Sequence, residues 1–308
     1  MKNKKKKQKP RKHYLAAIIF TGIVVIVLWI VVASIMNKKL VNLEWYHEEM
    51  HLEAAWKKSK GEGITIAILD TGISDESYEK FDDRIIDPYN VLTESDDVTD
   101  LNGHGTSIAV IIGADYKSFG IYGVAPKANI MPVVVADGSG RTTAEKVAEG
   151  IYYAVNKGAD IINISLGARL FNQMVEDATL YAFEQGVLVI ASAGENNSDE
   201  LHYPASFDHV LAVSAQSMLG RLYMDTNYNE KSVVIPGEYI KTLSVHHETK
   251  ADFIIYRSGS SFSTAIMSGL AALKLNQADV SPDAFMALMA ELNHEKLEDT
   301  FFDSRWIL

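Results

Sequence analysis

Short runs of apolar residues alternate along this chain with segments whose apolar residues recur every three or four positions. The runs lie at 64–69, 129–135, 160–164, 187–191 and 210–214 and predict buried strands. The periodic segments lie at 104–113, 143–157, 173–185, 261–275 and 282–292 and predict helices. Continuous apolar strands separated by amphipathic helices are typical of a parallel sheet covered on both faces. We therefore expect an α/β fold with a doubly wound, mostly parallel sheet and helices on both faces.

An uncharged apolar stretch at residues 15–36 precedes this pattern. Its 22 residues would span ~33 Å as a helix, enough to cross a bilayer. Residues 1–39 contain ten Lys or Arg and no acid, and such basic segments tend to stay in the cytoplasm. We expect a cytoplasmic tail at 1–14 and one transmembrane signal anchor at 15–36. The alternative is a cleaved signal peptide with 31–33 as its cleavage site.

The remainder of the chain is strongly acidic. The whole chain carries −11 and residues 1–39 carry +10, so residues 40–308 carry −21, a charge that would repel nucleic acid. We expect a juxtamembrane segment at 37–62, helical over 42–58, and one domain at 63–308. The membrane orientation places that domain outside the cell, on a single-pass protein of the cell membrane. The chain has no cysteine, so it has neither a disulfide framework nor a thiolate metal site.

Three distant segments supply a carboxylate, an imidazole and a hydroxyl in that order. Asp70 follows the first predicted strand, His104 stands between two glycines at a predicted helix start, and Ser261 begins another predicted helix. Each residue alone has a structural explanation, as a turn-capping acid, a polar helix-start residue or an N-cap. Together, the order Asp, His, Ser is a known arrangement for nucleophilic acyl transfer.

From about Gly63 to about Leu275 the chain resembles the subtilisin family of serine proteases. The resemblance is carried by Asp70-Thr-Gly, Asn-Gly-His104-Gly-Thr and Gly-Ser-Ser261-Phe-Ser-Thr-Ala, with intervals of 34 and 157 residues. It implies that Asp70 orients His104, that His104 acts as general base, and that Ser261 is the nucleophile. It also implies the subtilisin-like form of the α/β fold, here preceded by the transmembrane helix.

Further segments at 123–126, 137–140 and 164–167 follow in the family's order. The resemblance implies that the last two pair with the backbone of an extended substrate, as in strand addition. The residues that would do so are Gly138, Ser139, Gly140, Ser165, Leu166 and Gly167. It also implies that 203–205 form a wall of the pocket for the residue before the scissile bond, with His202 at its floor. Asp199 and Glu200 nearby suggest basic substrates.

One position departs from the family where the oxyanion region is expected, at the Ser261 backbone and the residues after Gly194. The family's oxyanion-donating Asn is replaced by Glu195, and an ionised carboxylate has no proton to donate. Glu195 could be protonated, a one-residue shift could present Asn196, or the enzyme could be slow or inert. A slow enzyme is favoured, because an inert one would not need all three triad residues.

Two other departures concern helix composition and ions. Ala265 stands where the family has Pro, and Lys117 lies in the loop where the family often binds calcium. A cation at that loop opposes Ca²⁺, so we expect neither a metal site nor a cofactor.

A zinc-protease pattern and an aspartic-protease triplet also occur. His47-Glu-Glu-Met-His51 fits H-E-x-x-H, but no third ligand and no preceding sheet accompany it. Asp70-Thr-Gly occurs once, whereas aspartic proteases need two such carboxylates. The sequence thus predicts a membrane-tethered serine endopeptidase that cleaves extended exported or cell-surface polypeptides. The alternative is a catalytically impaired pseudoprotease that binds peptides or regulates. The sequence indicates no oligomeric state.

Overall fold

The computed structural model describes residues 22–29, 43–246, 248–277 and 281–294. The chain divides into two compact units, residues 1–43 and 44–308. In the first unit, residues 22–29 are helical and exposed. The rest of the expected anchor, the expected cytoplasmic tail at 1–14 and the alternative cleavage site at 31–33 lie outside the described residues. Within the described ranges, no helix combines the length and apolar character needed to span a membrane.

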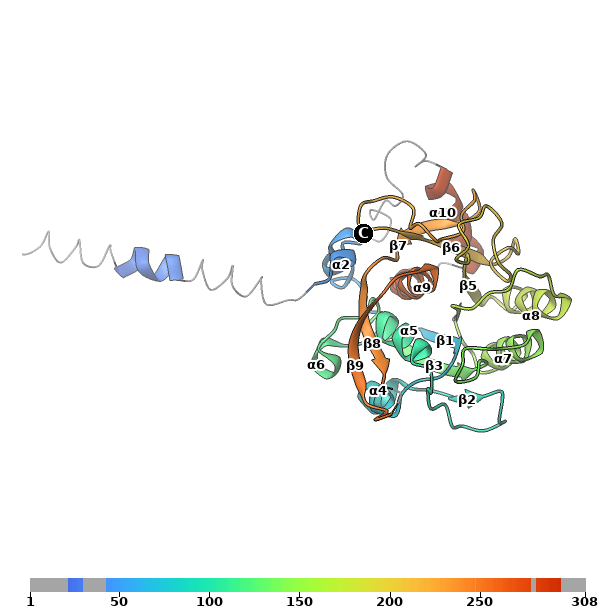
Figure 1. The fold of residues 1–308 in the computed structure, drawn as a ribbon. Helices are drawn as coiled ribbons and strands as arrows, with labels where there is room; N and C mark the ends of the chain where they lie inside the picture. Colours follow the sequence, from blue (N-terminus) through green and yellow to red (C-terminus); the bar gives the residue numbers. More distant parts are fainter. Residues whose placement is uncertain (1–21, 30–42, 247, 278–280, 295–308) are drawn as a thin grey trace, which may run out of the picture. The chain divides into compact units, whose positions relative to one another are not determined.

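A seven-stranded parallel sheet forms the centre of the second unit (Figure 1). Its strands are β1 (Thr65–Asp70), β2 (Tyr89–Asn90), β3 (Asn129–Val134), β4 (Ile161–Ile164), β5 (Leu188–Ser192), β6 (Leu211–Gln216) and β7 (Val233–Pro236). They adjoin in the order β2-β3-β1-β4-β5-β6-β7. The predicted α/β fold with a mostly parallel sheet is confirmed, and β2 and β7 are additions to the five predicted strands.

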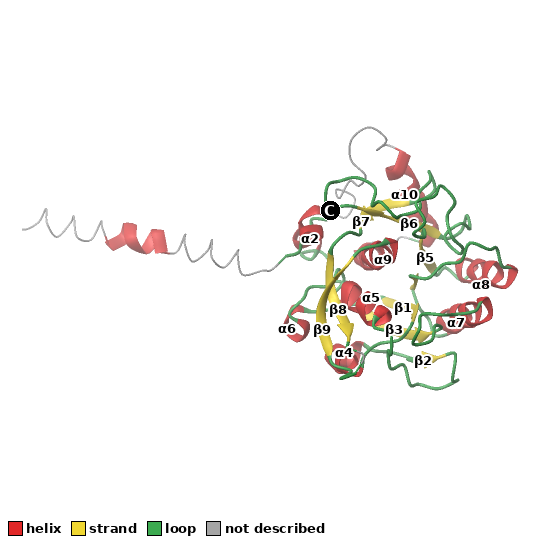
Figure 2. Cartoon of the chain, in the orientation of Figure 1, coloured by secondary structure: helices red, strands yellow, loops and turns green. Residues whose placement is uncertain are grey.

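Helices cover both faces of this sheet (Figure 2). They are α4 (Asp75–Phe81), α5 (His104–Gly113), α6 (Tyr116–Phe119), α7 (Ala144–Asn156), α8 (Gln173–Glu184), α9 (Ser260–Gln277) and α10 (Pro282–His294), with a 3₁₀ turn at Asp82–Arg84. Side chains along β1 alternate between two cores: Ile66 and Ile68 pack with α5 and α9, whereas Ala67 and Leu69 pack with α7. This alternation follows from the two-residue period of a strand.

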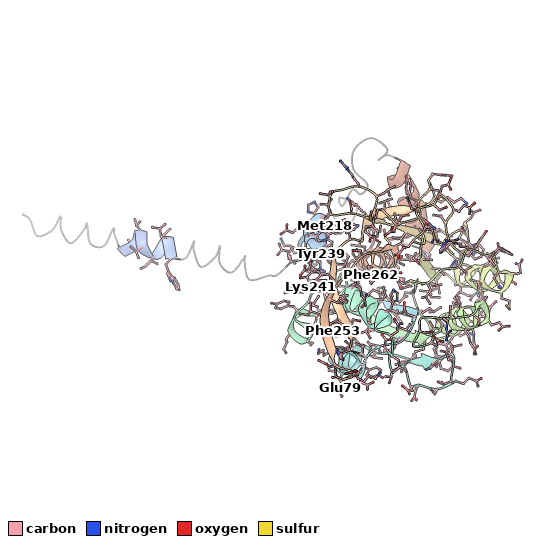
Figure 3. All side chains as sticks on the ribbon, viewed as in Figure 1. Glu79, Met218, Tyr239, Lys241, Phe253 and Phe262 are labelled. Carbon is pink, nitrogen blue, oxygen red and sulfur yellow. The ribbon has the colours of Figure 1, made fainter. Side chains whose placement is uncertain are left out.

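An antiparallel hairpin, β8 (Ile240–Val245) and β9 (Asp252–Arg257), leads into α9. Figure 3 labels Lys241 on the first of these strands and Phe253 on the second. The connection places the end of β9 directly before the start of α9.

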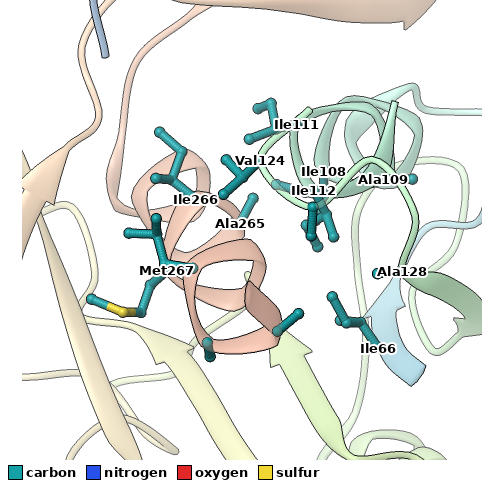
Figure 4. Close-up of a cluster of buried hydrophobic side chains, with 14 of the residues drawn as sticks. Ile66, Ile108, Ala109, Ile111, Ile112, Val124, Ala128, Ala265, Ile266 and Met267 are labelled. Atoms are coloured by element: carbon teal, nitrogen blue, oxygen red, sulfur yellow. The ribbon is translucent and has the colours of Figure 1, made fainter. Parts of the chain in front are cut away.

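Helix α9 is buried, and its position is fixed by packing (Figure 4). Ala265 and Ile266 have no exposed surface, and they lie in one cluster with Ile108 and Ile112 of α5. Ala265 keeps the backbone N–H that the family's Pro lacks, and the helix continues through it. Because the body of α9 is held in the core, its first residues have a defined place beside the sheet.

The predicted helix at 42–58 is wrong in detail. It is two short helices, α2 (Trp45–Glu49) and α3 (Leu52–Ala55), separated at His51, whose φ of 49° lies in the left-handed region. Tyr46 and Leu52 are fully buried, and Trp56 donates from Nε1 to the carbonyl oxygen of Val124 at 2.8 Å. These residues therefore pack within the same compact unit as the sheet.

Candidate active site

The strand order reverses at β1, which lies between β3 on one side and β4 on the other. In open parallel sheets, sites form at the carboxyl ends of the strands where the order reverses. Asp70 ends β1 at this point and its side chain is fully buried. Its Oδ1 accepts the Thr71 N–H at 2.8 Å, and Oδ1 and Oδ2 lie 2.8 and 2.9 Å from Nδ1 of His104. The carboxylate therefore holds His104 as the tautomer with hydrogen on Nδ1.

His104 is the first residue of α5 and is set close to β1 by glycines. A Cβ on Gly105 would lie 2.2 Å from the carbonyl oxygen of Gly72, so only glycine permits this approach. The imidazole is 26% exposed, and its ring centroid lies 5.7 Å from that of Phe262. Burial of the ring disfavours its charged form, but the charge and hydrogen bond of Asp70 outweigh burial and raise the pKa of His104.

A second carboxylate, which no motif indicated, supports this loop. Asp100 is buried, and Oδ1 accepts from the N–H groups of Asn102 and Gly103, both at 2.8 Å. Its Oδ2 accepts from the N–H and the hydroxyl of Thr106. An Asp shortly before a predicted helix start is a capping signal that could have identified it. Asp100 fixes the entry to α5, and its charge also favours the protonated form of His104.

Ser261 is the second residue of α9, directly before Phe262 (labelled in Figure 3). Its hydroxyl donates to the carbonyl oxygen of Ser165 at 2.9 Å, and the Ser165 hydroxyl lies 3.0 Å from the carbonyl oxygen of Ser261. In the described part of the chain no hydrogen bond joins Ser261 to His104. The structure thus pairs Asp70 with His104 and directs the nearby Ser261 hydroxyl toward the end of β4.

Glu195 follows β5 and lies at the start of α9. Its Oε1 is 3.5 Å from the hydroxyl of Ser260, and a Cβ on Gly259 would lie 2.0 Å from the same oxygen. The side chain retains contact with solvent, but desolvation of its carboxyl raises the pKa of Glu195 despite the opposing hydrogen bonds of Ser260 and the charge of His104. A carboxylate at a helix N-terminus interacts favourably with the free N–H groups there.

Asn196 takes part in a different set of contacts. Its Oδ1 lies 2.7 Å from Nε2 of His202 and 3.3 Å from Nε of Arg169, and its backbone N–H donates to Oδ1 of Asn227. Glu195, and not Asn196, contacts the first residues of α9 in this structure.

Of the two segments expected to bind substrate, Gly140, Leu166 and Gly167 line one cleft of about 610 Å³, whereas Gly138, Ser139 and Ser165 are not part of its lining. Asp137 shapes the first segment by accepting from the N–H and the hydroxyl of Ser139 at its Oδ1, and the carbonyl oxygen of Gly138 accepts from Asn102. The lining of the cleft includes Gly140, Leu166, Gly167, Leu170, Phe171 and Tyr203. His202 lies outside this cleft and lines a second, smaller hollow.

The zinc-like pattern has no metal-binding geometry. His47 is buried, Nε2 donates to the carbonyl oxygen of Tyr122 at 3.0 Å, and Nδ1 accepts the N–H of Glu44. Burial lowers the pKa of His47 to about 3. His51 is exposed and precedes a different helix, so the two histidines do not share one helix face as the motif requires.

The chain belongs to the subtilase family, because the family model with the description "Subtilase family" matches residues 61–300. It is 35% identical over 234 residues to the thermophilic serine proteinase of Bacillus sp. (strain AK1), a match that covers 75% of this chain and 57% of that protein. It is 32% identical over 232 residues to thermitase of Thermoactinomyces vulgaris, covering 75% of this chain and 81% of that protein. The chain thus spans little more than half of the first of these relatives.

A solved structure shows the same architecture. The crystal structure of a cold adapted subtilisin-like serine proteinase matches with a TM-score of 0.68 and 27% identity, covering 80% of this chain and 87% of that chain. The expected subtilisin-like form of the fold is therefore confirmed.

Proposed function

We propose that this protein is a serine endopeptidase that hydrolyses extended polypeptides with Asp70, His104 and Ser261. The observation that carries the proposal is the buried Asp70 carboxylate on Nδ1 of His104, at the sheet edge where α9 presents Ser261. Membership of the subtilase family supports the same reaction.

The reaction begins with a change in the Ser261 rotamer. The hydroxyl leaves the carbonyl oxygen of Ser165, its partner in the resting structure, and turns to Nε2 of His104. His104 takes the hydroxyl proton as Oγ bonds to the scissile carbonyl carbon, then gives that proton to the leaving amine. Water repeats the sequence on the acyl-enzyme. His104 must be neutral to accept the proton, so activity rises as pH increases through its raised pKa.

A fluorophosphonate probe tests the nucleophile directly. The wild-type protein is expected to be labelled, and the Ser261→Ala variant is expected to lose the label because no other hydroxyl is activated by His104. Ser260→Ala is the matched control, one residue earlier in α9, and it is expected to retain the label. In-gel fluorescence and mass spectrometry of the labelled peptide give the readout. Label on Ser260, or none on the wild type between pH 5 and 9, contradicts the proposal.

Glu195 makes the proposed enzyme slow. Its carboxylate lies at the start of α9, where the Ser261 N–H would donate to the developing oxyanion. An anion at this place repels the oxyanion and offers no donor. The same observation, together with the Ser261–Ser165 hydrogen bond, favours the second candidate function, a peptide-binding pseudoprotease.

Replacing Glu195 separates these two functions. One oxyanion donor in a subtilisin is worth about 100- to 1,000-fold in turnover. Glu195→Asn is therefore expected to raise kcat at least about tenfold, measured on a fluorogenic peptide at pH 8. Asp199→Asn, the neutralisation of a nearby exposed carboxylate, serves as control and should leave kcat unchanged. The absence of turnover in both the wild-type protein and the Glu195→Asn variant would support the pseudoprotease.

The membrane tether is also part of the proposal. It is supported by the uncharged apolar run at 15–36 and by the ten basic residues of 1–39, in contrast to the −21 of the remainder. Both features predict a single-pass protein with the peptidase domain outside the cell.

Fractionation of cells tests the tether. The full chain is expected in the membrane fraction, with residues 44–308 digested by protease added to intact spheroplasts. Removal of residues 1–40 is expected to move the protein to the soluble fraction, whereas Ser261→Ala in the full chain stays with the membrane. Full-length protein in the soluble fraction would refute this part of the proposal.

A further inference from the structure

The lining of the hollow beside Asn196 includes a cation, Arg169, in a domain of strongly negative net charge. Its volume is about 270 Å³, and it is lined by Arg169, Asn196, Ser198, Glu200, Leu201, His202 and Asn227. In the described residues, Arg169 has no carboxylate within ion-pair distance, and its one side-chain hydrogen bond runs from Nε to Asn196. Its terminal guanidinium nitrogens therefore have no acceptor in the described part of the chain, whereas residues 40–308 as a whole carry −21.

His202 connects this hollow to the segments around the scissile bond. A Cβ on Gly167 would lie 3.0 Å from Cβ of His202, and a Cβ on Gly194 would lie 2.7 Å from its Cγ. The imidazole thus lies against the end of the expected substrate-binding segment on one side. On the other side it lies against the residue before Glu195. A substrate side chain that enters between these segments meets His202 and Asn196.

In the described residues, the hydrogen bonds around Asn196 leave the terminal N–H groups of Arg169 as available donors. Oδ1 of Asn196 accepts from both Nε2 of His202 and Nε of Arg169, so one amide oxygen orients both side chains. Burial and the charge of Arg169 lower the pKa of His202, which favours the neutral imidazole. Arg169 is therefore the positive charge that an incoming side chain meets beside Asn196.

The acidic residues that suggested basic substrates also hold the loop through their backbones. The backbone carbonyl oxygens of Asp199 and Glu200 accept from Asn229 and Asn227, which fixes the loop. The Glu200 side chain also borders the hollow, but no ion pair joins it to Arg169 in the described residues. Glu200 is the one residue with a carboxylate in the described lining. Its negative charge weakens the positive potential of Arg169, but the two side chains are not in direct contact as an ion pair.

We propose that Arg169, oriented by Asn196, selects a substrate whose side chain before the scissile bond is a carboxylate. An arginine binds a carboxylate through two parallel, charge-assisted hydrogen bonds. A neutral amide has the same shape as the carboxylate but lacks its negative charge, so it binds the arginine more weakly. This inference rests on the proposed function for its connection to cleavage, but its binding step does not require turnover.

Two peptides that differ only in Glu or Gln at this position test the inference. With wild-type protein, kcat/KM is expected to be about tenfold higher for Glu at low ionic strength, as for a charge-assisted hydrogen bond. The preference is expected to shrink in about 0.5 M NaCl because added salt screens the pair. Fluorescence anisotropy with the Ser261→Ala variant gives the corresponding ratio of affinities for the two product peptides from the N-terminal side of the cleavage site.

Charge reversal supplies the matched variants. Arg169→Glu is expected to abolish the preference for the Glu peptide and to favour a Lys peptide instead. Glu200→Gln is expected to increase the preference for the Glu peptide. Arg221→Glu makes the same charge change on an exposed loop and should leave the Glu-to-Gln ratio unaltered. Equal kcat/KM and equal affinity for Glu and Gln overturn the inference while leaving the peptidase intact. A Glu preference in binding with no hydrolysis and no fluorophosphonate label instead upholds the inference and refutes the proposed function.

Discussion

The contact between Asp70 and His104 is the interaction on which the site depends. A carboxylate without solvent exposure is costly unless it is paired and hydrogen-bonded, and here the Thr71 N–H and the imidazole supply those partners. The surrounding chain is arranged to allow the contact. Glycines let the start of α5 approach the end of β1, and Asp100 holds the loop that leads into α5. Packing therefore positions the His104 imidazole, and the Asp70 carboxylate fixes its tautomer.

The start of α9 serves two anions that cannot occupy it together. The helix is buried from Phe262 to Leu273, so its first N–H groups are fixed in place and favour negative charge. In the resting structure the Glu195 carboxyl lies there, and the Ser261 hydroxyl is held by Ser165. In the proposed acyl transfer the oxyanion would need the same N–H groups. Under the proposed function, the stability of the resting arrangement and the speed of the reaction would therefore be opposed at this point.

Sequence patterns predicted the elements whose cause is local. The five long strands followed from continuous apolar runs, and α5, α7, α8 and α9 followed from helical periodicity. The break at His51 was not predictable, because a left-handed residue inside a periodic segment is stabilised by tertiary packing of Tyr46 and Leu52. The contacts of Asn196 with His202 and Arg169 were missed for a related reason: they join the connection after β4 to the connection after β5, which only the folded sheet brings together.

The pKa of His104 reports the charge of Asp70 at the imidazole. NMR titration of the His104 ring in Ser261→Ala protein should give a pKa above the ordinary value of about 6.5. Asp70→Asn removes the charge and leaves burial, so the pKa should fall below about 6.5. Asp83→Asn, which neutralises an exposed carboxylate, should not change it. The same His104 pKa with and without the Asp70→Asn substitution would mean that the Asp70 carboxylate does not act on the imidazole.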